Sequence, residues 1–102
     1  MVPSVGQIVH YKLSTVDAGD INRLRADALS SRSDSAHLGF LVRVGNAVKP
    51  GDTYAMMIVK TWGDTEESPV NGQVHLDGDD VYWVQRVTQG KGDGQWQEPP
   101  RS

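Results

Sequence analysis

The sequence predicts a mainly β fold, a small five-stranded SH3-like barrel with one short α-helix inserted between the first two strands. Three observations predict this fold class. The chain has 102 residues, the size of one ordinary domain. Five short segments rich in β-branched and aromatic residues are separated by turn-forming sequences. A closed barrel would also remove the exposed edges that so short a sheet otherwise leaves.

The first expected strand covers residues 5–13, VGQIVHYKL, which has no helix or strand breaker after its glycine. Strand alternation places Val9, Tyr11 and Leu13 on one face, and we expect this face to be buried. Four more strands are expected over residues 39–45, 53–62, 70–77 and 81–87. The TYAMMIVKTW segment among them is nearly all apolar, which predicts a central strand covered on both faces.

A helix is expected over about residues 16–29. The preceding STVD sequence places Ser14 or Thr15 as the N-cap, with an acid in the first turn. Apolar residues then recur at spacings of three and four and predict a buried stripe of Ile21, Leu24 and Ala28. The polar SSRSDSAH sequence that follows predicts a loop.

The whole chain, residues 1–102, is expected to form a single domain. Its strand-rich part covers about residues 5–88. The tail, residues 89–102, is rich in glycine and proline and is expected to be irregular, with Trp96 as its anchor. Trp62, Trp83 and Tyr54 are expected in the core, because large aromatic side chains fill small barrels. One or two of them at the rim would instead form a stacking platform.

Composition excludes several classes of protein. There is no cysteine, which removes disulfides, thiol catalysis and cysteine-ligated metals. The net charge of −3 argues against a duplex DNA binder that relies on phosphate contacts. No apolar run reaches the length of a membrane helix, and the first residues lack the pattern of a signal peptide. We therefore expect no membrane association.

The sequence carries no catalytic or metal-binding signature. His10, His37 and His75 lie far apart, without the spacing of zinc ligands. No nucleophile elbow occurs, and the glycine-rich GKGDG segment lacks the pattern of a phosphate-binding loop. We expect a protein that is not an enzyme, with no catalytic residue, no metal and no cofactor.

Several specific segments carry a resemblance to a known group: VGQIVHYKLS, INRLRADA, VGNAVKPGDTY, VKTWGD and VNGQVHLDGDDVYWV. With these segments the chain resembles small uncharacterised proteins encoded by actinobacterial phages and prophages. The resemblance covers about residues 5–101. It implies a phage-encoded protein that works in the host cytoplasm or, in a second interpretation, within the virion.

The leading functional hypothesis is a non-enzymatic binding protein that sequesters a small anionic or nucleotide signal and so counters host defence. Guanidinium and ammonium groups suit phosphates, aromatic rings suit a base face, and amides suit a base edge. The candidate ligand-binding residues are Tyr11, Lys12, Asn22, Arg25, Trp62 and Asn71. For Arg25, packing of its stem against the barrel is the alternative to contact with a ligand.

Two other functions remain open on the sequence. The first is a virion accessory protein, of the decoration or head–tail type, since small β-barrels suit repeated assemblies. The second is a protein-interaction module that inhibits a host protein. The partner would accordingly be a nucleotide-like small molecule or a phage or host protein, and a homo-oligomer is also left open.

Overall fold

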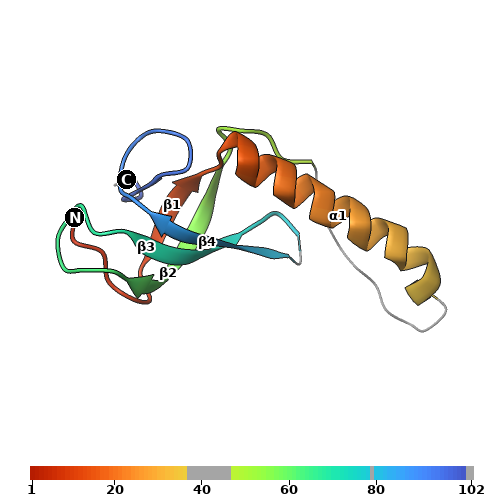
Figure 1. Ribbon diagram of the computed structural model, residues 1–102, viewed down its shortest axis with the longest axis horizontal. Helices are drawn as coiled ribbons and strands as arrows, with labels where there is room; N and C mark the ends of the chain where they lie inside the picture. Colours follow the sequence, from red (N-terminus) through yellow and green to blue (C-terminus); the bar gives the residue numbers. More distant parts are fainter. Residues whose placement is uncertain (37–46, 79, 101–102) are drawn as a thin grey trace.

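The computed structural model describes residues 1–36, 47–78 and 80–100, without the side chains of residues 28–36, and it is mainly β. Five strands form one antiparallel sheet, and one helix projects from an end of it (Figure 1). The elements in chain order are β1 (Ile8–Lys12), α1 (Thr15–Ala36), β2 (Thr53–Thr61), β3 (Val70–His75), β4 (Val81–Val87) and β5 (Trp96–Gln97). The mainly β class with one helix is thus confirmed, while the strand expected at residues 39–45 lies outside the described residues.

The sheet is not closed. Its strand order is β4-β3-β2-β1-β5, so β4 and β5 are the outer strands. Just beyond β4, Gln89 forms a single parallel bridge with Trp96 of β5. Around it, the Trp96 N–H donates to the carbonyl of Thr88 at 3.1 Å, and the Gly90 N–H donates to the carbonyl of Trp96 at 2.9 Å. This short contact joins the two ends of the sheet without a ladder between β4 and β5.

One face of the sheet forms the core, as strand alternation predicts. Val9, Tyr11 and Leu13 are all buried, which confirms the predicted inward face of the first strand. The other strands, the loop before β2 and the residue after β3 contribute Val48, Met56, Ile58, Val70, Val74, Leu76 and Val84. Gly72 belongs to the same inward row, and a Cβ there would lie 2.4 Å from the Met56 sulfur, so the buried methionine fills the space above the glycine.

The tail is more ordered than its composition predicts. Trp96 is fully buried, which confirms it as the anchor, and it forms β5 together with Gln97. These two residues pair with Tyr11 and His10 of β1. A strand of two residues has no periodicity to recognise, and it forms because burial of a large indole stabilises it.

The helix is longer than predicted and presents a different face. It continues to Ala36, because no glycine or proline interrupts the chain between Gly19 and Gly39 and serine alone does not end a helix. Ile21 is buried as predicted, but Leu24 is 56% exposed, so its assignment to the buried stripe is wrong. The side chain of Ala28 lies outside the described residues.

The buried stripe of the helix is instead Ala18, Ile21 and Arg25. These residues also recur at spacings of three and four, so both phases fit a helix. Hydrophobicity alone favours the phase with Leu24. The observed phase buries Arg25 because the carboxylate of Asp80, just before β4, pairs with it.

Candidate functional site

Most exposed large apolar side chains of the sheet lie on the face opposite the core, here called the outer face. Its exposed apolar residues are Ile8, Met57, Val59, Trp62, Val81 and Trp83. Strand register places Ile8 beside Met57, Met57 beside Gln73, and Gln73 beside Trp83. A continuous row therefore crosses four strands.

This arrangement corrects two predictions. Trp62 and Trp83 are 45% and 55% exposed, so they do not belong to the core, whereas Tyr54 is half-buried. Strand β2 is covered on one face only, with Met57 and Val59 exposed on the other. The interior is already filled by Tyr11, Trp96 and Met56, and a four- or five-stranded sheet can leave one face in water.

The charged residues of the strands all have one sign. None of the five strands contains an aspartate or glutamate, although the chain has 13 of them. The charged strand residues are Lys12, Lys60 and Arg86. An acidic protein thus carries a sheet whose fixed charges are cationic.

Two irregularities of the sheet meet at the end of the outer face near Trp62. The β2–β3 register shifts between Ile58 and Lys60, and the β3–β4 register shifts between Val70 and Gly72. Opposite the second shift, Arg86 has a φ of 52°, in the left-handed region that non-glycine residues rarely adopt. Bulges redirect side chains, and a strained backbone at a bulge is a feature of binding and catalytic sites.

Asn71 connects these features. It lies on the outward side of β3 but is only 7% exposed, because neighbouring side chains cover it. Its Oδ1 accepts a hydrogen bond from Trp62 Nε1 at 3.0 Å and another from the backbone N–H of Arg86 at 2.9 Å. One amide thus orients the indole and holds the left-handed backbone of Arg86.

Two cations lie over the Trp62 ring. Lys60 Nζ is 4.2 Å from the ring centroid, and Arg86 Cζ is 4.9 Å from it. At an exposed position such a contact is worth about 0.5–1 kcal/mol, so either cation can turn to another partner at small cost. We call Lys60, Trp62, Asn71 and Arg86 the Trp62 cluster. It offers an aromatic surface and two positive charges to a planar anion.

The structure brings together two of the six residues predicted to bind a ligand, Trp62 and Asn71. Lys60 and Arg86 were not among the predicted residues. Lys60 could have been found, because it lies two residues before Trp62 and alternation places both on one face. Arg86 could not, since its direction depends on the bulge.

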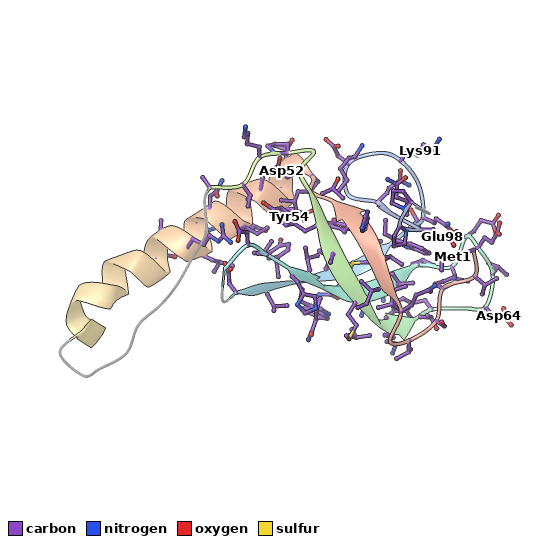
Figure 2. All side chains as sticks on the ribbon, turned by 180° about the vertical axis from the view of Figure 1, so that it is seen from behind. Met1, Asp52, Tyr54, Asp64, Lys91 and Glu98 are labelled. Atoms are coloured by element: carbon purple, nitrogen blue, oxygen red, sulfur yellow. The ribbon has the colours of Figure 1, made fainter. Side chains whose placement is uncertain are left out.

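Three of the other predicted residues attach elements to one another. The Tyr11 hydroxyl donates to Asp17 Oδ2 at 2.5 Å, and burial together with this carboxylate raises the pKa of Tyr11. Asn22 exchanges two hydrogen bonds with the backbone of Val48, at 2.9 and 3.0 Å. Lys12 Nζ donates to the carbonyl of Lys91 at 3.0 Å, in the loop labelled at the edge of Figure 2.

Arg25 is buried and forms an ion pair with the partly exposed Asp80. Its Nε and Nη2 donate to the two carboxylate oxygens of Asp80 at 2.7 and 3.0 Å, and Nη2 also donates to the carbonyl of Asp77 at 3.1 Å. The hydrogen bonds from Arg25 hold the pKa of the Asp80 carboxyl below its usual value. Tyr54 lies nearby on β2, where burial raises its pKa (Figure 2). This guanidinium is bonded to the connection between β3 and β4 rather than open to a ligand.

The hollows of the described surface fit an anion less well than the Trp62 cluster does. One of about 470 Å³ is lined by Glu66, Glu67, Thr88 and Gln89, and its two carboxylates would repel an anion. A narrower one lies between His10, Lys12, Thr53 and the residue 90–97 segment; Lys12 and Lys91 make it cationic, but it has almost no free volume to admit an anion. Within residues 1–36, 47–78 and 80–100, no group of three histidine, aspartate or glutamate side chains is placed to hold a metal ion. No helix in the described part of the chain is long and apolar enough to cross a membrane.

Comparison of the chain with protein-family models, with curated proteins and with solved structures found no match.

Proposed function

We propose that the protein is a non-catalytic binding protein that holds a small, nucleotide-like anion at the Trp62 cluster. One observation carries this proposal: an exposed indole with two cations over it, fixed from below by the buried amide of Asn71. The absence of carboxylates from the strands supports it further, because nothing in the sheet would repel a phosphate.

The expected binding mode uses each group for a different part of the ligand. The base stacks on Trp62, a contact that every base can make because each has a π-face. The phosphate binds Lys60 and the guanidinium of Arg86. Both cations leave the Trp62 ring and contact the anion instead. No step of chemistry is required, and the function is capture.

This function fits the phage-encoded protein that the sequence resembles. In that setting the ligand is an anionic signal of host defence, and the protein would lower its concentration in the host cytoplasm. The SH3-like barrel also belongs to the proposal, supported by the Gln89–Trp96 bridge between the two ends of the sheet. Closure there would leave the outer face as the accessible binding surface.

A thermal-shift panel tests the proposal, with cyclic and linear nucleotides, NAD-derived metabolites and inorganic phosphate as probes. A ligand at a hundred times its dissociation constant adds about 2.7 kcal/mol, or roughly 10 °C for a domain of this size. We expect such a rise with one nucleotide class and little with phosphate. The rise should be lost in the double variant Lys60→Ala, Arg86→Ala.

The matched control is Arg23→Ala, which removes an exposed cation from the helix, where Arg23 pairs with Asp20. It should keep the full rise. A flat panel with the unsubstituted protein would contradict the proposal.

The exposed apolar row gives one observation in favour of a second function, a protein-interaction module. Aromatic residues, methionine and arginine are enriched in protein interfaces, and the outer face contains Met57, Trp83 and Arg86. Inhibition of a host protein and assembly into a virion would both use this face. A flat panel combined with a stable complex through the outer face would favour this function.

A further inference from the structure

We infer that the ligand of the outer face is a single-stranded nucleic acid that runs across the sheet from Trp62 to Trp83. The inference rests on the proposed function, because it takes the Trp62 cluster as the site of the first nucleotide. It adds a second position, and it changes the expected ligand from one nucleotide to a chain of at least two.

The two exposed indoles are close together on the sheet. Trp62 lies over Asn71, to which its Nε1 is hydrogen-bonded, and Trp83 is the β4 partner of Gln73. Asn71 and Gln73 are two residues apart on the same side of β3, which corresponds to about 7 Å along the strand. Adjacent bases of an extended strand can therefore meet the two rings in turn.

The surface between and around the Trp62 and Trp83 rings is mostly apolar, so it suits the bases of a ligand rather than its charged groups. Ile8 and Met57 continue the row from Trp83 through Gln73 and are apolar and exposed. Stacking on aromatic side chains needs no hydrogen-bond code and tolerates any base. We expect little dependence on base identity.

The charges of the strands favour a nucleic acid over a second copy of this chain. Lys60 and Arg86 stand at one end of the row, and the strands hold no carboxylate to pair with them. If two copies met face to face, their strands would supply no carboxylate for these cations. A phosphate backbone supplies an anion at every nucleotide. Duplex DNA fits less well, because its bases are stacked on each other and closed to the indoles.

The test is a fluorescence titration with thymidylate monomer, dimer and tetramer. Two of the three tryptophans are exposed on the outer face, while Trp96 is buried and provides a constant signal. Stacking on a second ring should make the tetramer bind at least about tenfold tighter than the monomer. With two cations involved, the slope of log affinity against log salt should be about −1.4.

Three variants assign the binding to residues. Trp83→Ala should reduce tetramer affinity to about that of the monomer and leave monomer affinity unchanged. Trp62→Ala should abolish binding of both. Leu24→Ala, which removes an equally exposed apolar side chain from the helix, should change neither. Melting temperatures show that each variant is folded.

The outcomes separate the two proposals. If the monomer binds and the tetramer binds no tighter, the ligand is a single nucleotide and the nucleic-acid inference is wrong, while the proposed function stands. If neither binds, the nucleic-acid inference is wrong, and the thermal-shift panel with its other nucleotides decides on the proposed function. If Trp83→Ala instead converts a dimer to a monomer in sedimentation, the row is a contact between copies and the inference is overturned.

Discussion

The backbone of Arg86 is strained at a position where the strain directs its side chain toward Trp62. A left-handed backbone costs a non-glycine residue about 1–2 kcal/mol, and here the buried oxygen of Asn71 holds the backbone N–H of Arg86 in that conformation. This conformation places the guanidinium of Arg86 over the Trp62 ring, a position that a regular strand would not give it.

Replacing this residue separates strain from contact. Arg86→Ala keeps the strain and loses the cation–π contact, whereas Arg86→Gly removes both, because glycine adopts positive φ freely. We expect Arg86→Gly to have the higher free energy of unfolding of the two, by about 1 kcal/mol. Urea unfolding of both variants measures this difference. A more stable alanine variant would show that the backbone at this position is unstrained.

The ion pair of Arg25 and Asp80 predicts an asymmetric response to substitution. The Arg25 side chain is 6% exposed and that of Asp80 30%, so the two groups differ in access to water when their partner is removed. Asp80→Ala removes the anion that faces a buried guanidinium, while its hydrogen bond to the Asp77 carbonyl remains, and should cost about 3–5 kcal/mol. Arg25→Met keeps the apolar stem and leaves a carboxylate that water can reach, so it should cost about 2 kcal/mol.

Thermal or urea unfolding of the two variants and of their combination tests this order. The double variant Arg25→Met, Asp80→Ala should be more stable than Asp80→Ala alone, because it no longer contains the buried guanidinium without its carboxylate. Equal costs for the two single variants would contradict the argument.

Residue roles were the hardest part to derive from sequence. Arg25 and Tyr11 have side chains that could bind a ligand. In the folded chain, however, Arg25 forms an ion pair with Asp80, and the Tyr11 hydroxyl donates a hydrogen bond to Asp17. Asp80 is 55 residues away from Arg25 in sequence, and no local pattern reveals such a pair. Trp62 and Asn71, chosen for their side-chain chemistry, stay candidates for ligand binding, and the fold brings them together because neighbouring strands place them on one face.

At the scale of elements, the start of the helix is fixed by a reciprocal pair of hydrogen bonds. The Asp17 N–H donates to Ser14 Oγ at 3.1 Å, and the Ser14 N–H donates to Asp17 Oδ2 at 3.0 Å. This capping box identifies Ser14 as the N-cap, where the sequence allowed Ser14 or Thr15. The same carboxylate accepts the Tyr11 hydroxyl, so the cap also ties the helix to β1.

The cap predicts a difference between two adjacent substitutions. Ser14→Ala should lower the free energy of unfolding by about 1 kcal/mol, because an N–H of the first turn loses its acceptor. Thr15→Ala is the matched control and should have almost no effect, since alanine suits the first helical position. Urea denaturation of both variants measures the two values. A larger effect at Thr15 would mean that the cap is misassigned.

The strands were largely predictable where the alternation of apolar and polar residues extends over several residues. Strands β1, β2, β3 and β4 appear where alternation and turn sequences place them. The two-residue β5 has no period, and the end of α1 lacks a glycine or proline to mark it. The exposed face of β2 was not predicted, because the sequence of an apolar strand is the same whether one face or both faces are covered.

At the scale of the whole molecule, the buried Tyr11 and the partly buried Tyr82 join the sheet to the helix and make stability depend on pH. Tyr82 of β4 donates to Asp20 Oδ2 at 3.0 Å, and burial and this hydrogen bond raise the pKa of Tyr82 to about 12. An unfolded tyrosine titrates near pH 10, so the folded state holds its proton longer. The contribution to stability is complete below about pH 10 and is lost as the pH rises towards 12.

Tyr82→Phe should therefore show a shallower loss of stability over that interval than the unsubstituted protein. Tyr11, whose pKa is also raised, keeps part of the slope in both proteins. Urea unfolding at several alkaline pH values gives the comparison. Identical slopes would show that the Tyr82 hydroxyl is not protected in the folded state.

The contrast between a cationic sheet and an acidic molecule has a kinetic consequence. At low salt the net charge of −3 repels an approaching anion before it reaches Lys60 and Arg86, so electrostatics do not accelerate the encounter. Near physiological salt, charges more than about 8 Å apart are screened, and association should proceed at an unsteered rate of about 10⁵–10⁷ M⁻¹s⁻¹. The short-range contacts act only after arrival. Selectivity among anions is therefore expressed in how long each one stays rather than in how fast it arrives.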